Sequence, residues 1–390
     1  MIEQPAVYLD HAATTPMRPE AVAAMLPFLV ETFGNPSGSH GSARRAKRAL
    51  EEARETVALE LGAAVGDVIF TSGGTEADYL AIVGAAHAAR TATGIGGRSG
   101  AGIVTTAFEH QAVLGAVGRL EREGFRVTRA AVDRDGIVDL DSLAEALDAG
   151  TVLVSVMLVN NEVGTIQPLD EVAALLAVRA PNAVLHTDAV QAVPWIDVAS
   201  AAADAQLVSI SAHKFGGPKG VGVLVARDGI ALEPQLAGGG QEQGRRPGTV
   251  NVAGVVAAAA AIEVTGQRRA EELTRVAALR DRLMRGLEAS VTGCVFNGDP
   301  ARQVAGTCSV EFPGVEAEVL LMALDRAGVQ AAAGSSCASG ALEPSHVLLA
   351  MDRTPAQVRS SIRLTLGHSS TDTDIDRALE VIPRVLESLS

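Results

Sequence analysis

The feature that most constrains the fold is an alternation of short, apolar, β-branched runs with amphipathic segments over the first two-thirds of the chain. The runs that predict strands are 67–71, 102–106, 151–158, 183–188, 205–211 and 220–226. Helical patterns separate several of them, at 75–89, 110–123 and 169–180. Apolar strands separated by helices are typical of parallel βαβ units, in which helices cover both faces of the sheet. The sequence therefore predicts an α/β fold with a mostly parallel sheet.

The last third of the chain has a different pattern. A long Ala-rich helical segment at about 252–289 predicts a connection to a second unit. Strand-like segments at 303–312 and 361–366 then alternate with helical patterns at 316–327 and 372–389, which is typical of a smaller α+β domain. A chain of 390 residues also exceeds the size at which a single core keeps growing. We therefore expect two domains.

Composition and charge narrow the classes of function. Apolar residues make up 47% and charged residues 20% of the chain, which is the balance of a folded, water-soluble protein. The net charge of −14 argues against direct nucleic-acid binding through a basic surface. The start MIEQPAVYLD lacks a signal-peptide pattern, and the longest apolar run, 252–262, is too short to cross a bilayer. We expect a cytoplasmic protein without nucleic-acid or membrane partners, with an exposed Gly-rich loop at 91–102.

The cysteines raise a separate question. Cys294, Cys308 and Cys337 are odd in number and share no CxxC spacing, which argues against a disulfide framework or a zinc site and favours a reducing compartment. Cys337 stands in AAAGSSCASG, residues 331–340, among small residues that cannot build a rigid core around it. From these residues alone it can be a buried small hydrophobe, half of a disulfide, a metal ligand or a nucleophile. Residue statistics favour the buried hydrophobe.

Polar residues gather where the predicted strands end, which is where ligands bind in open α/β sheets. The stretch SAHKFGGPKG, at 211–220, follows an apolar strand and places Lys214 at its carboxyl end. A lysine there either extends to solvent or serves as an amine nucleophile, and carbonyl cofactors such as pyridoxal phosphate need such an amine. The GGPKG that follows lacks the spacing of a phosphate-binding P-loop.

The stretch HTDAVQA, at 186–192, ends another predicted strand. Asp188 is either a cap or ion-pair partner, or an acid that keeps a pyridine nitrogen protonated and so makes a cofactor an electron sink. His186 and Asp188 also suit a metal ion, but no third ligand follows at a suitable spacing. We therefore predict no metal site.

Three further turns follow strands. The stretch SGGTEADYL, at 72–80, is a strand–Gly–Gly–helix transition whose backbone N–H groups and Thr75 hydroxyl suit an anion. His110 is either structural or stacks on a ring and shuttles protons. Asn160 and Asn161 either form a turn or contact a ligand. Each signal is weak alone, but together a lysine, an acid, a histidine, an anion-binding turn and two asparagines at one sheet edge are what a pyridoxal phosphate site needs.

The motifs resemble those of the NifS/IscS-type cysteine desulfurases, within the class V aminotransferase family of fold-type I pyridoxal phosphate enzymes. They run in family order over nearly the whole chain: YLDHAATTP (8–16), FGNPSGSH (33–40), FTSGGTEAD (70–78), EHQAV (109–113), NNEVGTIQP (160–168), HTDAVQA (186–192), SAHKFGGPKGVG (211–222), GGGQEQGRRPGTVN (238–251), GSSCASGALEPSHVL (334–348) and SIRLTLG (361–367). The resemblance implies a large cofactor-binding domain, 16–260, with a mostly parallel seven-stranded sheet. It also implies a small α+β domain, formed by 1–15 together with 261–390, that carries a catalytic cysteine loop at about 331–345.

The same resemblance implies how the cofactor would be held. Lys214 would form the Schiff base with pyridoxal phosphate and move the α-proton of the substrate. Asp188 would pair with the pyridine nitrogen, and Gln191 would contact the ring hydroxyl. His110 would stack over the ring and exchange protons. The phosphate would be bound by Gly74, Thr75, Ser211 and His213, and by Thr249 of the neighbouring subunit, which implies a homodimer with shared sites.

Substrate and sulfur chemistry are implied as well. Asn161 and Arg363 would bind the carboxylate of L-cysteine, and Asn35 would line the same pocket. Cys337 would attack the substrate sulfur, take it as a persulfide and release alanine, and only its thiolate can attack. The sulfur would pass to a protein acceptor, either an iron–sulfur cluster scaffold or a tRNA thiolation enzyme. The long small-residue segment around Cys337 resembles the group with a long catalytic loop.

The chain departs from the family pattern at three positions. Gly216 replaces an aromatic residue, Pro247 stands where a small residue is more usual, and His11 stands where asparagine or tyrosine is common. Two alternatives stay open: a selenocysteine lyase or another cysteine lyase of the same fold, and a non-catalytic scaffold of desulfurase type. The presence of the lysine, the aspartate and the loop cysteine argues against the scaffold.

Overall fold

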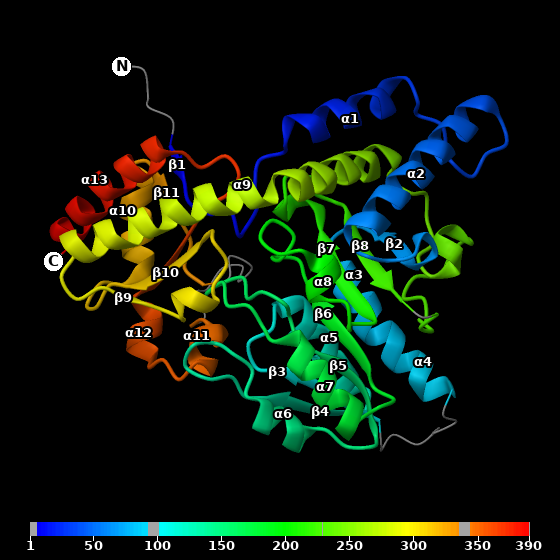
Figure 1. Cartoon of the computed structure of the whole chain (residues 1–390), viewed down its shortest axis with the longest axis horizontal. Helices are drawn as coiled ribbons and strands as arrows, with labels where there is room; N and C mark the ends of the chain where they lie inside the picture. Colours follow the sequence, from blue (N-terminus) through cyan, green and yellow to red (C-terminus); the bar gives the residue numbers. More distant parts are fainter. Residues whose placement is uncertain (1–5, 93–100, 228, 335–343, 390) are drawn as a thin grey trace.

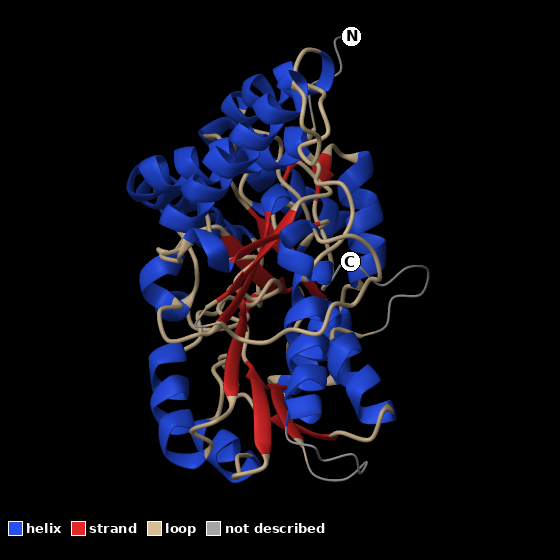
Figure 2. Cartoon of the chain, turned by 90° about the vertical axis from the view of Figure 1, so that its right-hand side faces the viewer, coloured by secondary structure: helices blue, strands red, loops and turns tan. Residues whose placement is uncertain are grey.

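The computed structural model describes residues 6–92, 101–227, 229–334 and 344–389. Its centre is a seven-stranded sheet with helices on both faces (Figure 1, Figure 2). In spatial order the strands are β2 (Val68–Thr71), β8 (Gly222–Ala226), β7 (Leu207–Ser211), β6 (Val184–Asp188), β5 (Thr151–Ser155), β3 (Gly102–Thr106) and β4 (Arg126–Ala130). The pairs from β7 across to β4 are all parallel, so the prediction of an α/β fold on a mostly parallel sheet is confirmed.

Strand β8 differs from the βαβ expectation, because it runs antiparallel to both of its neighbours, β2 and β7. Its connection from β7 consists of residues 212–221 and contains a 3-10 turn, η3 (Ala212–Lys214). A parallel pair needs a crossover of about a dozen residues or more, and this connection is shorter. The tight turn therefore keeps Lys214 at the carboxyl end of β7.

Alternate side chains along the strands enter two separate apolar cores. On one face, Val104 and Val154 are completely buried, and on the other face Ile103 and Leu153 are. The first face is covered by α2 (Gly41–Glu60), α6 (Leu140–Ala146), α7 (Leu169–Arg179) and the first half of α9 (Val252–Ser290). The second face is covered by α3 (Gly74–Tyr79), α4 (Ala85–Ala92) and α5 (Gln111–Arg122). This two-sided burial explains why the strands read as continuous apolar runs.

The segment predicted as one helix at 75–89 is helical but irregular. Between α3 and α4 it contains a π-helical turn at Leu80–Gly84. Such turns are rare inside helices and occur frequently at functional sites. The segment begins directly after β2, so its N-terminus lies at the sheet edge that also carries Lys214.

Helix α9 links the large sheet to a second core (Figure 1). Its first half packs under the large sheet through Val255 and Ile262, and its second half packs through Val276 and Leu283 in the second core. That core surrounds a three-stranded antiparallel sheet of β12 (Ser361–Thr365), β10 (Thr307–Glu311) and β9 (Val295–Phe296). One continuous helix thus belongs to both cores.

The N-terminal strand β1 (Val7–Tyr8) pairs in parallel with β11 (Val329–Gln330), so the start of the chain packs with its last third. The remaining helices are α1 (Pro19–Val30), α8 (Val198–Ala201), α10 (Ala317–Arg326), α11 (His346–Ala350), α12 (Pro355–Arg359) and α13 (Asp372–Leu389). We propose that the chain divides into a large domain, 16–260, and a small domain formed by 1–15 together with 261–390. Among the described residues, no helix is both long enough and apolar enough to cross a bilayer.

Candidate active site

A pocket of about 180 Å³ lies at the carboxyl ends of β5, β6 and β7, next to the N-terminus of α3. One buried water needs only about 15 Å³, so the pocket has room for an organic ligand. Its lining includes residues that the sequence singled out, namely Gly74, Thr75, His110, Asn161, Asp188, Gln191, Ser211, His213, Lys214 and Arg363. The structure therefore brings these side chains to one place from six separate segments of the sequence.

Lys214 occupies the turn that follows β7. Its Nζ donates hydrogen bonds to the carbonyl oxygens of Ala12 and Ala13, at 2.6 and 2.8 Å. The side-chain amide of Gln191 also donates to the Ala12 carbonyl, at 2.8 Å. The segment after β1 thus crosses the pocket and holds the lysine amine through its backbone.

Two departures from the family pattern have structural reasons. Gly216 has φ +89°, and a Cβ there would lie 2.5 Å from Cγ of Arg18, so the buried arginine takes the space of a side chain. His11 packs against Gly367, where a Cβ would lie 2.3 Å from Nδ1 of the histidine. Nδ1 of His11 also lies 2.8 Å from the hydroxyl of Thr15. At both positions the neighbouring residues fit the unusual residue, and Lys214 still occupies the turn after β7.

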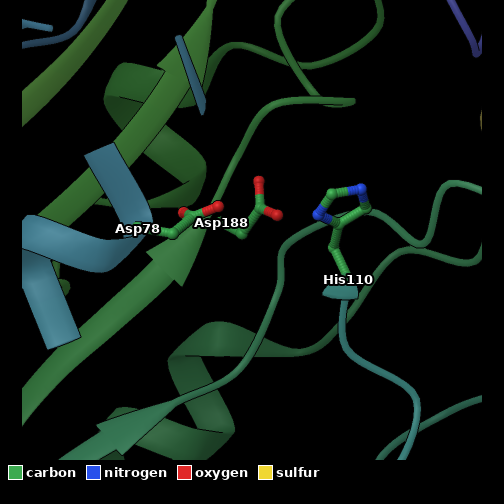
Figure 3. A group of neighbouring side chains, drawn as sticks. All are labelled: Asp78, His110 and Asp188. Atoms are coloured by element: carbon green, nitrogen blue, oxygen red, sulfur yellow. The ribbon is translucent and has the colours of Figure 1, made fainter. Parts of the chain in front are cut away.

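Asp78, His110 and Asp188 face one another across the pocket (Figure 3). They come from α3, from the residue that precedes α5 and from the end of β6, and one ligand-type atom of each lies within 4.8 Å of the others. The sequence offered no third group beside His186 and Asp188, and the structure supplies Asp78 and His110 from distant segments. Two carboxylates and an imidazole can hold a cation, either a metal ion or a protonated ring nitrogen.

The carboxyl groups of this region are hard to ionise. Burial, followed by the like charge of Asp78, raises the pKa of Asp188 to about 7. Burial raises the pKa of Glu109 to about 8, although the Met157 N–H and the Thr106 hydroxyl donate to its Oε1 at 2.9 and 2.7 Å. A charged group deep in protein is unfavourable without a counter-charge, so both acids favour a cationic partner or a proton.

A row of polar side chains crosses the sheet beneath Asp188. His186 lies two residues before Asp188 on β6, so the two side chains share one face of the strand. Nδ1 of His186 is 2.8 Å from the Ser155 hydroxyl and Nε2 is 3.0 Å from the Ser209 hydroxyl. Nε2 also lies 3.6 Å from Oδ1 of Asp78. This row links the floor of the pocket to both neighbouring strands.

The part of the pocket at the start of α3 suits an anion. A Cβ on Gly74 would lie 2.9 Å from Cγ2 of Val190 and 3.3 Å from Cβ of Ser211, so only glycine fits at the start of α3. Free backbone N–H groups at a helix start, together with hydroxyls such as those of Thr75 and Ser211, bind phosphate well. Burial and the charge of Lys214 lower the pKa of His213 to about 4, which makes that side chain a neutral hydrogen-bonding group near pH 7.

Arg363 reaches the pocket from the small sheet. It is 2% exposed, and its guanidinium donates to the Asn161 carbonyl and to Oδ1 of Asp10, both at 2.8 Å. Its buried Nε has no hydrogen-bond partner among the described residues. The guanidinium is therefore fixed in orientation and keeps donor capacity for a ligand.

Two predicted site residues are not part of the pocket lining, and a third is not among the described residues. Asn35 is exposed, and its Oδ1 accepts from the Ser37 N–H at 2.9 Å. Thr249 is exposed as well, in a segment that an ion pair of Arg246 with Glu76 attaches to α3 at 2.8 Å. Cys337 lies outside the described residues. The roles given to all three therefore stay predictions.

Glu162 lies between the two described ends of the segment that contains Cys337. Ser345 donates a 2.5 Å hydrogen bond to Oε2 of this buried carboxylate, and a Cβ on Gly334 would lie 3.4 Å from the same oxygen. One residue further, His346 approaches the Glu109 carbonyl through Nε2, at 2.9 Å. The residues that flank the segment 335–343 therefore contact Glu162 and Glu109, the sequence neighbours of Asn161 and His110.

The two other cysteines have unreactive surroundings. Complete burial raises the pKa of Cys308 to about 12. Partial burial, followed by the charge of Glu288, raises the pKa of Cys294. Because the thiolate is the nucleophile, neither residue suits sulfur chemistry near pH 7.

Sequence reasoning missed Asp78, Glu109 and Glu162. Asp78 and Gly74 are four residues apart on one helix face, which was a usable signal once Gly74 had been placed at a ligand. Glu109 and Glu162 stand beside predicted site residues, but nothing in their spacing shows that they are buried. Their importance depends on which strands and loops become neighbours.

A sequence model of the family described as Aminotransferase class-V matches residues 7–378. The chain is 42% identical over 383 residues to "Cysteine desulfurase IscS" of Clostridium botulinum, with 98% of this chain and 94% of the relative covered. It is 45% identical over 382 residues to "IscS-like cysteine desulfurase" of Mycobacterium tuberculosis, with 96% and 95% covered. The solved structure of a NifS-like protein matches with a TM-score of 0.91 at 34% identity, and the match covers 98% of this chain and 100% of that one.

Proposed function

The chain belongs to the aminotransferase class-V family and is a cysteine desulfurase, and from this premise we propose how its residues perform the reaction. It converts L-cysteine to L-alanine and passes the sulfur, through a persulfide on Cys337, to a protein acceptor. The observation that carries this proposal is the shared pocket in which the lysine amine of Lys214, the buried acid Asp188 and the imidazole of His110 meet.

Pyridoxal phosphate is the proposed cofactor, and the pocket fits it at both ends. The glycine at position 74 leaves space where a Cβ would meet Val190 and Ser211, which suits the phosphate. Elsewhere in the pocket, Asp188 is buried and its pKa is raised to about 7, so it suits a protonated ring nitrogen. When bound, the cofactor supplies an electron sink for the bonds at the α-carbon of the substrate.

Lys214 is the proposed covalent attachment point and the base that moves the α-proton. The carbonyls of Ala12 and Ala13 orient its amine. His110 is the proposed ring-stacking group, and its Nδ1 accepts a hydrogen bond from the Ala112 N–H at 3.1 Å. The neutral imidazole then carries its proton on Nε2, which makes that atom the donor toward substrate.

Arg363 and Asn161 are proposed to bind the carboxylate of L-cysteine. A guanidinium that is already fixed by two hydrogen bonds loses little freedom when a carboxylate binds. Arg363 lies on β12 of the small sheet, and the rest of the pocket comes mainly from the large sheet. The bound substrate would therefore contact residues of both sheets.

Cys337 is proposed to take the sulfur. Gly334 is three residues away in the sequence, and three residues span at most about 11 Å. Because Gly334 lies against Glu162, next to Asn161, the chain length allows Cys337 to reach the substrate. The raised pKa values of Cys294 and Cys308 support Cys337 over the other two cysteines.

A homodimer with shared sites is the proposed assembly. Helix α1 and the residues after it expose apolar side chains, of which Val30 is 71% and Phe33 is 74% exposed, and a second copy is the proposed occupant of this surface. Thr249, exposed and outside its own pocket, is then available to a partner's phosphate site.

The proposed acceptor is an iron–sulfur scaffold or a tRNA thiolation enzyme, and the proposed compartment is the cytoplasm, where Cys337 stays reduced.

The test is turnover by the purified full chain, with and without added pyridoxal phosphate. We expect L-cysteine to yield one alanine for each sulfur transferred to a thiol acceptor, only in the loaded enzyme. Parallel assays with L-selenocysteine separate the lyase alternative, since turnover of that substrate alone would contradict the desulfurase assignment.

A further inference from the structure

The pocket contains a second buried carboxylate for which the proposed reaction has no use. Asp78 is 1% exposed and lines the pocket beside Asp188. Its Oδ1 has no hydrogen-bond partner among the described residues. The distance from this oxygen to Nε2 of His186 is 3.6 Å, which is too long for a hydrogen bond. A buried polar atom without a partner needs an explanation, because most such atoms in proteins are paired.

Asp78 and Asp188 are close enough to repel each other. One carboxylate oxygen of Asp78 lies within 4.8 Å of one of Asp188, and Figure 3 shows the two side chains as neighbours. At that distance in a buried site, like charges disfavour joint ionisation, which is one cause of the raised pKa of Asp188. His186 on β6, Glu109 in the turn before α5 and His110 interact electrostatically with this pair. The charged groups of Lys214 and Arg363 and the imidazole of His213 line the same pocket.

We infer that Asp78 is a positioning residue for cofactor capture, because it keeps beside Asp188 a negative charge that a cation at the ring nitrogen relieves. This inference rests on the proposed function, since the cation is the protonated ring of pyridoxal phosphate. In the cofactor-free enzyme the two carboxylates repel each other. When the protonated ring is bound, its positive charge attracts both carboxylates. Asp78 therefore makes the empty pocket less stable and the loaded pocket tighter.

The variant Asp78→Asn tests this, because it removes the charge and keeps the volume. At pH 8.5 we expect pyridoxal phosphate to bind the cofactor-free chain about 10-fold more weakly, which corresponds to one pKa unit of lost interaction. We also expect the cofactor-free variant to unfold about 2 °C higher than wild type, because the repulsion is gone. A residue with a purely structural role would give the opposite change in unfolding temperature.

The pH dependence gives the sign of the effect. Below its raised pKa of about 7, Asp188 is protonated in the empty pocket, and the repulsion with Asp78 disappears. The gain in unfolding temperature should therefore be present at pH 8.5 and much smaller at pH 5.5. An equal gain at both pH values would overturn the inference.

One control variant separates a charge effect inside the pocket from a change in net charge. Asp204→Asn makes the same change in net charge at an exposed position outside the pocket and should alter neither measurement. A variant Asp78→Asn that binds the cofactor as tightly as wild type, or that unfolds at a lower temperature without it, contradicts the inference. Wild-type enzyme that takes up no pyridoxal phosphate would instead overturn the proposed function, and this inference with it.

Discussion

The two sheets of the molecule contribute to the pocket in different ways. The large sheet provides Lys214, Asp188 and, through α3, Asp78, all at the ends of buried strands or the helix that packs on them. The small sheet provides Arg363, and the chain between β11 and α11 contains Cys337. Rigid strand ends hold groups that must stay fixed relative to a cofactor, whereas the substrate and the sulfur have to enter and leave. We infer that the two sheets divide the work along that line.

This division gives distinct expectations for the two sides. Changes to the cofactor-facing groups of the large sheet should weaken or remove cofactor binding, because every later step depends on the cofactor. Changes on the small-sheet side should leave the bound cofactor spectrum intact and affect substrate binding or sulfur transfer. Variants that mix the two effects would break the comparison.

The largest expected effect is that of Lys214→Ala. Without the amine, the enzyme should lose the visible absorbance of the covalently held cofactor and about 10⁴-fold of its turnover, because Lys214 is proposed to supply both the attachment and the proton transfer. The measurement is an absorbance spectrum after addition of pyridoxal phosphate, together with alanine release. A wild-type spectrum in this variant would refute the role of Lys214.

An intermediate effect is expected for Arg363→Lys. A lysine cannot reproduce the two-pronged contact of the guanidinium, and the loss of about 2 kcal/mol of charge-assisted hydrogen bonding corresponds to about 30-fold in KM. The cofactor spectrum should not change, and kcat should change much less than KM. Steady-state kinetics with L-cysteine measure both, and an altered spectrum with unchanged KM would place Arg363 on the cofactor side instead.

The smallest effect is expected for the contact between Glu162 and Ser345. Glu162→Gln and Ser345→Ala should each slow sulfur transfer to Cys337 about 5-fold, because the hydrogen bond between the two side chains contributes about 1 kcal/mol. The double variant should be no slower than either single one, because the two changes remove the same contact. Additive losses in single-turnover rates would show that the two residues act separately.

Much of the site was predictable because it depends on local pattern. Lys214, Asp188 and His110 each follow an apolar run, and the carboxyl ends of parallel strands converge by geometry. The long helix α9 was predicted within a residue or two, because its Ala-rich pattern is uninterrupted. These features need no knowledge of which segments become neighbours.

Other features depend on neighbours and were missed. Strand β4 lies at the sheet edge and reads RVTRA, a polar pattern that does not resemble the buried strands. The strands β9 and β11 have only two residues each, too short for a period to show. Asp78 could be found only after Gly74 had been placed at a ligand, and the role of Glu162 depends on its contact with Ser345, which no local signal reports.

The most direct test of the division between the two sheets is a single turnover with L-cysteine, followed by the mass of each cysteine-containing peptide. We predict one added sulfur atom on the Cys337 peptide, one alanine released for each, and no added sulfur on Cys294 or Cys308. Cys337→Ala should keep the cofactor spectrum and lose the persulfide. Sulfur on either of the other cysteines, or undiminished transfer by Cys337→Ala, would contradict the account.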